Sequence, residues 1–289
     1  MRLRAVIAGC CLTLGLVPGC AGIRLRREKL AETPAAAELR AELSQAATAA
    51  MDRQDYAQAR VDLERLLAQS PRSAELNFRL GKVLQSQGEL TGAQAAFRRA
   101  LELEPLYVGA LVGLGQIQAR LNRPELALQR FDQAIEADPH RAEAHFARGQ
   151  TLETLNRLDD ALAAYFRSLE LDPAASPAIV RVAALQRDRG QPDQALVRLD
   201  QATELAPEDP EVRFQRGMTL LALNRPGSAI EDLSFASDRT PDRADVLLGL
   251  ARAFEADRKP ELARQTADRA LRAQPDSPVA RELSERLRR

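Results

Sequence analysis

The chain has 289 residues, of which 45% are hydrophobic, 28% are charged and 4% are aromatic, with no tryptophan. This composition is typical of a folded, helix-rich protein and excludes an intrinsically disordered chain. The 41 basic and 41 acidic side chains balance to a formal charge of zero, so the composition indicates no basic surface for nucleic acid.

The N-terminal segment has the pattern of a secretory signal. Two arginines precede an uncharged, mostly apolar run over residues 5–23. Gly19-Cys20, near the end of this run, resembles the cleavage site of bacterial lipoproteins, in which the cysteine is acylated and becomes the new N-terminus. We therefore expect residues 1–19 to be a signal peptide and Cys20 to be lipidated. Ala21, rather than aspartate, follows the cysteine, which in that family indicates the outer membrane, facing the periplasm.

Two other fates of this segment stay open. The uncharged run is just long enough to span a bilayer as an uncleaved inner-membrane anchor. The larger positive charge after the run would then place the rest of the chain in the cytoplasm. Alternatively, an ordinary signal peptide is cleaved and the protein is released. In the lipoprotein interpretation, residues 20–39 hold the lipidated cysteine and act as a tether.

An internal repeat with a period of 34 residues follows this segment. Seven of the 16 prolines keep the period: Pro71, Pro105, Pro139, Pro173, Pro207, Pro241 and Pro275. We call these the repeat prolines. Twelve residues before each of them stands an alanine: Ala59, Ala93, Ala127, Ala161, Ala195, Ala229 and Ala263. Such spacing predicts pairs of helices that pack through small residues.

Further columns of the repeat support two helices per period. Twenty-four residues before each repeat proline stands glycine or alanine, and eight before it, except in the last repeat, a large side chain. Small residues let two helices approach, and a large neighbour fills the adjoining hole. Seventeen residues before, the column holds glycine or asparagine except at Gln54 and Arg258. Glycine and asparagine tolerate the left-handed backbone that ends a helix and reverses the chain.

These columns resemble those of tetratricopeptide repeats. The resemblance implies an all-α, right-handed solenoid of seven helix–turn–helix repeats and a capping helix, at 40–73, 74–107, 108–141, 142–175, 176–209, 210–243, 244–277 and 278–289. The chain departs from that family where a bulky aromatic is often found early in the first helix. Polar residues stand there in repeats two, four and six: Asn77, His145 and Arg213. We expect looser packing of the first helix in these repeats.

The two histidines of the chain lie close together beside two carboxylates. His140 and His145 are accompanied by Asp138 and Glu143, a set that could indicate a metal or acid–base site. Histidines five residues apart point in directions about 140° apart on a helix and do not converge. Their order also differs from the zinc-binding helical motif. We therefore expect a structural role, with no catalytic residues, no metal and no cofactor.

The resemblance implies that the first helices line a concave face that binds partner peptides. The column 27 residues before the repeat prolines holds Ser44 in the first repeat and then an apolar ridge: Phe78, Val112, Phe146, Val180, Phe214 and Leu248. One turn later come Lys82, Gln116, Gln150 and Met218. An extended peptide could place side chains on the ridge while Gln116 and Gln150 bond its backbone. The alternative, that the phenylalanines pack against the neighbouring repeat, stays open.

The function expected from these observations is that of a non-enzymatic scaffold or adaptor at the bacterial envelope. The chain resembles tetratricopeptide lipoproteins that assist the assembly of pili or secretion systems. We expect a protein or peptide partner and membrane attachment through the lipid, with no nucleic acid and no small-molecule substrate. Two alternatives stay open: an adaptor that recruits cell-wall enzymes, and an inner-membrane-anchored cytoplasmic scaffold in a signalling complex.

Overall fold

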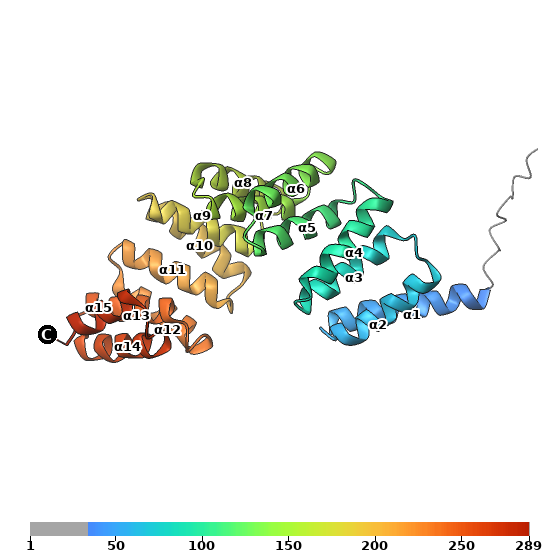
Figure 1. Cartoon of the computed structure of the whole chain (residues 1–289). Helices are drawn as coiled ribbons and strands as arrows, with labels where there is room; N and C mark the ends of the chain where they lie inside the picture. Colours follow the sequence, from blue (N-terminus) through green and yellow to red (C-terminus); the bar gives the residue numbers. More distant parts are fainter. Residues whose placement is uncertain (1–33, 289) are drawn as a thin grey trace, which may run out of the picture. The chain divides into compact units, whose positions relative to one another are not determined.

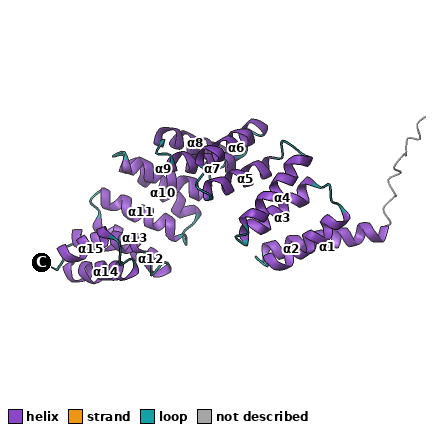
Figure 2. Ribbon diagram, viewed as in Figure 1, coloured by secondary structure: helices purple, strands orange, loops and turns teal. Residues whose placement is uncertain are grey.

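A computed structural model describes residues 34–288, and all regular structure within this range is helical (Figure 2). The predicted all-α solenoid is thereby confirmed. The helices follow one another along the chain as labelled in Figure 1. Their bounds are α1 Pro34–Asp52, α2 Tyr56–Gln69, α3 Ala74–Ser86, α4 Leu90–Leu103, α5 Val108–Arg120, α6 Pro124–Ala137, α7 Ala142–Thr154, α8 Leu158–Leu171, α9 Ser176–Asp188, α10 Pro192–Leu205, α11 Pro210–Ala222, α12 Pro226–Arg239, α13 Ala244–Ala256, α14 Pro260–Ala273 and α15 Pro278–Arg286.

The helices are stacked in consecutive pairs. The chain divides into two compact units, and the second, from Glu42 onward, contains the repeats. Within it, each first helix from α3 onward packs against its own second helix, as α3 does against α4, and α1 shares a buried cluster with α2. The second helix then packs against the next first helix, and most consecutive first helices also meet, as α3 and α5 do. Each pair therefore covers an apolar face of its neighbour, as the repeat pattern requires.

The first helix begins before the first predicted repeat. α1 starts at Pro34, so residues 34–39, assigned from the sequence to the tether, are helical. Proline suits the first turn of a helix, where its missing N–H has no intrahelical partner, and the alanines that follow favour helix.

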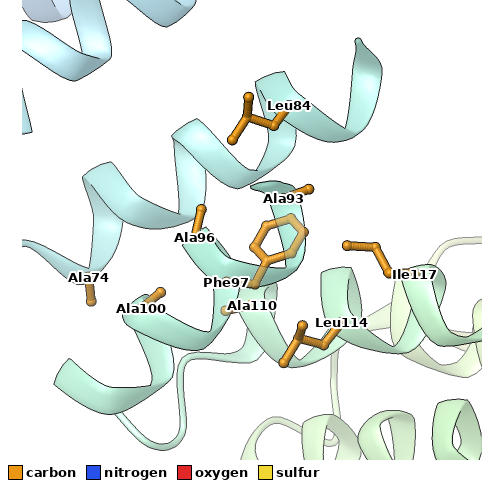
Figure 3. Close-up of a cluster of buried hydrophobic side chains, with 9 residues drawn as sticks. All are labelled: Ala74, Leu84, Ala93, Ala96, Phe97, Ala100, Ala110, Leu114 and Ile117. Atoms are coloured by element: carbon orange, nitrogen blue, oxygen red, sulfur yellow. The ribbon is translucent and has the colours of Figure 1, made fainter. Parts of the chain in front are cut away.

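Inside each repeat, the large side chain of one column packs against the small residue of another. The seven alanines twelve residues before the repeat prolines are all 0% exposed. A Cβ added at Gly81 would lie 2.5 Å from the Phe97 ring, so this ring occupies the space that the missing side chain leaves. Figure 3 shows Phe97 among the alanines and aliphatic side chains of α3, α4 and α5. Where the small residue is Ala183 instead, the large one, sixteen residues later, is Leu199.

All seven turns within the repeats use the same backbone. The residue seventeen positions before each repeat proline has a positive φ: Gln54 59°, Gly88 80°, Asn122 56°, Asn156 57°, Gly190 76°, Asn224 56° and Arg258 57°. Glutamine and arginine therefore adopt the conformation that glycine and asparagine favour. The stacking of the helices imposes this turn even where the local residue opposes it.

The C-terminal helix covers the last repeat. α15 packs against α14 and α13, with Ala280 and Leu283 buried. Ser277 begins the helix by accepting a hydrogen bond from the Ala280 backbone N–H at 3.3 Å. The helix thus closes the apolar face that a terminal repeat would otherwise expose.

Candidate peptide-binding groove

The six apolar residues predicted to form the ridge differ in how much surface they expose. Val112, Val180 and Phe214 are at most 7% exposed and belong to clusters of the core. The other three are half-buried: Phe78, Phe146 and Leu248. A side chain that its neighbours already remove from water has little area left for a ligand. Of the predicted apolar ridge, only Phe78, Phe146 and Leu248 therefore reach the surface in part.

Phe78 joins two repeats. Its ring centroid lies 5.2 Å from that of Tyr107 and 6.0 Å from that of Phe97. A Cβ added at Gly109 would lie 2.8 Å from the Phe78 ring, so glycine on α5 makes room for it. The Tyr107 hydroxyl donates to Glu75, and burial followed by this bond raises the pKa of Tyr107. Most of the contacts of Phe78 are therefore with its own and the neighbouring repeat, as in the alternative interpretation of the sequence.

Phe146 occupies the equivalent place two repeats later, with different neighbours. Its ring lies 5.6 Å from that of Tyr165, whose hydroxyl donates to Glu153 Oε2 at 2.8 Å. Arg181 Nε donates to the same carboxylate oxygen at 3.1 Å. Burial and then the bond to Glu153 raise the pKa of Tyr165, so the phenol stays neutral. This network ties α7 and α8 to α9.

Phe214 is the most enclosed of the three phenylalanines. The Arg243 guanidinium lies 4.8 Å from its ring centroid, a cation–π contact. Arg243 Nη1 donates to Glu211 Oε2 at 2.5 Å, and its other nitrogens bond Asp245. The hydrogen bonds that Arg243 donates to Asp245 and to Glu211 raise the pKa of its guanidinium. The guanidinium therefore covers the ring and takes it out of the binding face.

A pocket lies between the first helices of repeats two, three and four. Its volume is about 390 Å³, and a glutamine from each of α3, α5 and α7 lines it: Gln85, Gln116 and Gln150. The remaining lining residues are Ala119, Arg120, Asn122, Pro124, Phe131, Ala147, Thr151 and Thr154. Of the predicted groove residues, Gln116 and Gln150 line this pocket, whereas the half-buried Lys82 and Met218 do not.

The three glutamine amides of the pocket are not equally available. Gln85 Nε2 donates to Gln116 Oε1 at 3.1 Å, and Gln116 Nε2 donates to Glu143 Oε1 at 3.3 Å. Gln150 is exposed and has no hydrogen-bond partner among the described residues. Its amide can therefore both donate to and accept from a peptide backbone. The Gln85 amide oxygen is also free to accept.

Comparison with known families agrees with this architecture. The tetratricopeptide repeat family matches residues 44–107, 78–129, 112–176, 183–234 and 214–278, which together make up more than half of the chain. The chain belongs to the tetratricopeptide repeat family. Proteins of this family are in general interaction scaffolds that bind protein or peptide partners, and the fold is typically non-catalytic. We found no match to the chain among curated proteins.

Several solved tetratricopeptide structures share the fold. YrrB, described as having an unusual peptide-binding site, is 23% identical with a TM-score of 0.54, over 66% of this chain and 99% of that one. PilF of Pseudomonas aeruginosa is 19% identical with a TM-score of 0.66, over 74% and 97%. A chain of the APC/C hetero-tetramer Cut9–Hcn1 is 15% identical with a TM-score of 0.74, over 86% of this chain and 48% of that one. At these identities the likeness is one of fold.

The polar residues that depart from the tetratricopeptide pattern close the turn between repeats. Each of them, and the matching residue of α15, bonds a backbone carbonyl in the preceding turn. The pairs are Asn77 Nδ2 to Ser73 O at 2.7 Å, His145 Nε2 to Pro139 O at 3.0 Å, Arg213 Nε to Pro207 O at 3.2 Å and Arg281 Nη2 to Pro275 O at 3.2 Å. Asn77 and His145 are at most 9% exposed. Looser packing was the wrong expectation for these two, because the buried polar group is hydrogen-bonded.

The stretch of this tetratricopeptide chain that holds both histidines stabilises the turn between repeats three and four. The carboxylate of Asp138 accepts from the His140 backbone N–H at 3.0 Å, while His140 is exposed. His145 points back to the carbonyl of Pro139 instead of toward His140. Within residues 34–288, no group of three or more His, Cys, Asp or Glu side chains could hold a metal ion.

Two residues of the tetratricopeptide groove were not predicted from the sequence. Arg120 and Thr154 line the pocket, and each follows a predicted residue, Gln116 or Gln150, by four positions. That spacing places them on the same helical face one turn later, which was the available signal. The hydrogen bond between Gln85 and Gln116 joins two repeats and had no such signal.

The predicted lipidation site lies outside the described residues. Residues 1–19 and Cys20 precede Pro34, where the description begins. Among the helices of residues 34–288, none combines the length and hydropathy that a membrane crossing requires.

Proposed function

We propose that this protein is a non-enzymatic scaffold of the bacterial envelope that binds an extended segment of a partner protein on the face formed by its first helices. The observation that carries the proposal is the pocket between α3, α5 and α7, with the unbonded amide of Gln150 at its surface. Side-chain amides in a row can bond the backbone of an extended peptide without regard to its sequence. YrrB, which has the same fold, has a peptide-binding site.

The place of action that we propose is the outer membrane, facing the periplasm. It rests on the N-terminal segment, in which a basic start, an apolar run and Gly19-Cys20 follow the lipoprotein pattern. Lipid attachment at Cys20 would hold the repeats near the membrane while leaving the groove free. Assembly of a pilus or secretion system is the setting that suits a tethered scaffold of this kind.

Site-specific photocrosslinking in the native cell tests the groove. A benzophenone amino acid at position 150 is expected to capture a partner protein, because Gln150 is exposed beside the pocket and free of contacts. The matched control is position 129, an exposed glutamine on the second helix α6. Equal capture from both positions, or capture from position 129 alone, would show that the groove is not the binding face. Substitution of Phe214 is a poorer test, because that ring is 7% exposed and its loss would perturb folding.

Detergent-phase partitioning tests the anchor separately. Wild-type protein is expected to enter the detergent phase. The Cys20→Ser variant is expected either to remain in the aqueous phase or to retain the uncleaved signal peptide, which its mass would show. Identical partitioning and identical mass of the two proteins would exclude acylation at Cys20.

A further inference from the structure

The acidic and basic side chains of α3, α5 and α7 differ in whether they are already bonded within the protein. These helices carry three carboxylates, and each is already bonded within the protein. Glu75 accepts from Tyr107, Glu143 accepts from Gln116 and Arg141, and Glu153 accepts from Tyr165 and Arg181. Arginines neutralise Glu143 and Glu153, whereas Glu75 keeps its charge but does not line the pocket.

Two of the four cations on the same helices are unpaired. Arg79 bonds Thr48 Oγ1 at 2.7 Å, and Arg148 forms an ion pair with Asp132 at 2.8 Å. Lys82 and Arg120 have neither a hydrogen bond nor an ion pair among the described residues. Arg120 lines the pocket and is exposed, and Lys82 lies one turn before Gln85 on α3. The face between repeats two and four thus presents uncompensated positive charge beside free amide groups.

We propose that this pocket binds an acidic side chain of the extended peptide, with Arg120 as its charged partner. The inference rests on the proposed function and specifies its ligand. A guanidinium presents two parallel N–H donors to a carboxylate, and such charge-assisted bonds are stronger than neutral ones. Gln150 donates to the peptide backbone next to the acidic residue. Lys82 adds attraction over a longer range, which salt weakens.

A peptide fits these observations better than a polyanion does. Nucleic acid binding uses many cations along a groove and gains affinity with each phosphate that is neutralised. Here two unpaired cations accompany three amides, and the whole chain has a formal charge of zero. Hydrogen-bond donors and acceptors in a row suit a polypeptide backbone, whereas the single pocket cation suits one carboxylate.

Selection of peptides by the full chain in detergent provides the test. A displayed library of random peptides is expected to yield binders enriched in Asp or Glu. Peptides of about 12 residues are used, because one extended segment of that length is enough to cross the three helices. Each selected peptide is then compared with its Glu→Gln or Asp→Asn form by fluorescence anisotropy. Arg120→Gln is expected to raise the Kd about tenfold, as loss of a charged hydrogen bond does. Lys82→Gln is expected to raise it less and to reduce its dependence on salt.

Arg123→Gln is the matched control. Arg123 lies three residues from Arg120 and is exposed, its side chain has no bonded partner among the described residues, and it does not line the pocket. Its substitution removes the same charge and is expected to leave the Kd within about twofold, as for other exposed charges. If Arg120→Gln melts at a lower temperature than wild type, Arg120→Lys keeps the charge without the paired donors and is expected to bind with intermediate affinity.

The possible outcomes separate the two proposals. Binders that tolerate the acid-to-amide change, or that lose affinity equally in Arg120→Gln and Arg123→Gln, would overturn the acidic ligand but leave the peptide groove. Displacement of the selected peptides by a single-stranded oligothymidylate, with the same dependence on Arg120, would overturn the peptide in favour of a nucleic acid. A library that yields no binder, together with no crosslink from position 150, would overturn the groove itself.

Discussion

The first helices of repeats two, four and six differ from those of repeats three, five and seven at three aligned positions. We call these the even and the odd first helices. The even ones carry Glu75, Asn77 and Phe78 in α3, Glu143, His145 and Phe146 in α7, and Glu211, Arg213 and Phe214 in α11. The odd ones carry Gly109, Leu111 and Val112 in α5, Pro177, Ile179 and Val180 in α9, and Asp245, Leu247 and Leu248 in α13.

The two sets show two ways of closing the same junction between repeats. In the odd helices an aliphatic side chain fills the space, with Leu111, Ile179 and Leu247 at most 5% exposed. In the even helices a polar side chain reaches the preceding turn and bonds its carbonyl. The helix pairs stack in both cases, because each solution leaves neither a void nor an unsatisfied polar group. Each solution, however, requires its own set of neighbours.

The largest effect on stability is expected in repeat six, where the polar side chain of the even first helix is the charged Arg213. Arg213 Nη1 and Arg216 Nε donate to Asp232 at 2.9 and 2.6 Å, and the Asp232 side chain is 1% exposed. Asp232→Ala would leave Arg213 without a counter-charge and Arg216 with only the half-exposed Asp200, at a cost of about 3 kcal/mol. Urea denaturation measures the change in the free energy of unfolding.

The same site allows a rescue and a control. Ala96 and Ala164 hold the equivalent position in repeats two and four, where Asn77 and His145 stand in place of Arg213. Adding Arg213→Asn to Asp232→Ala should therefore recover part of the lost stability. Asp200→Ala removes a half-exposed partner of Arg216 and is expected to cost less than about 0.5 kcal/mol. Equal losses for Asp200→Ala and Asp232→Ala would mean that the buried ion pairs of Asp232 contribute no more to stability than the half-exposed one of Asp200.

The second effect concerns converting the glycine–aromatic pair of repeat two into the alanine–leucine pair of repeat five. Gly81→Ala alone should cost about 1–3 kcal/mol, because the added Cβ meets the Phe97 ring at 2.5 Å. Phe97→Leu alone should cost about 1–2 kcal/mol through the space that it opens. The double variant reproduces Ala183 with Leu199, and its cost should fall below the sum by about 1 kcal/mol or more. Strict additivity in a double-mutant cycle would contradict the size matching.

A smaller effect is expected at the even histidine. His145→Leu gives repeat four the aliphatic residue of the odd helices and removes the bond to the Pro139 carbonyl. We expect a loss of about 1 kcal/mol, the usual contribution of one hydrogen bond. The control is His140→Leu, whose side chain is exposed and whose substitution should be nearly neutral. Thermal melting of both variants distinguishes the two histidines, and a neutral His145→Leu would show the two solutions to be interchangeable.

The smallest effect concerns the turns, in which even and odd repeats share one backbone. Arg258, in the last repeat, has a φ of 57° and is exposed, and its side chain has no bonded partner among the described residues. Arg258→Gly should raise the free energy of unfolding by about 0.5–1 kcal/mol, because glycine adopts this conformation without steric cost. Asn224→Gly should gain less, since asparagine already tolerates it. A loss of stability in Arg258→Gly would assign an unrecognised role to the arginine side chain.

Much of the fold was predictable from the sequence for a local reason. The alanine, the small residue and the large residue of a repeat meet each other within that repeat, so their spacing alone predicts two packed helices. The left-handed turn was equally local where glycine or asparagine stood in the column. At Gln54 and Arg258 the residue gave no such signal, and the position in the repeat predicted the turn instead.

The binding face was decided by contacts between repeats. Phe78 and Phe214 share a residue type and a column, yet Phe214 is 7% exposed beneath Arg243 and Phe78 remains half-buried. Periodicity assigns a side chain to a face of a helix, whereas its exposure depends on the size and hydrogen bonding of neighbours about 30 positions away, which vary from repeat to repeat. For the same reason, only the tertiary structure showed which carboxylates are already engaged and that Arg120 remains free.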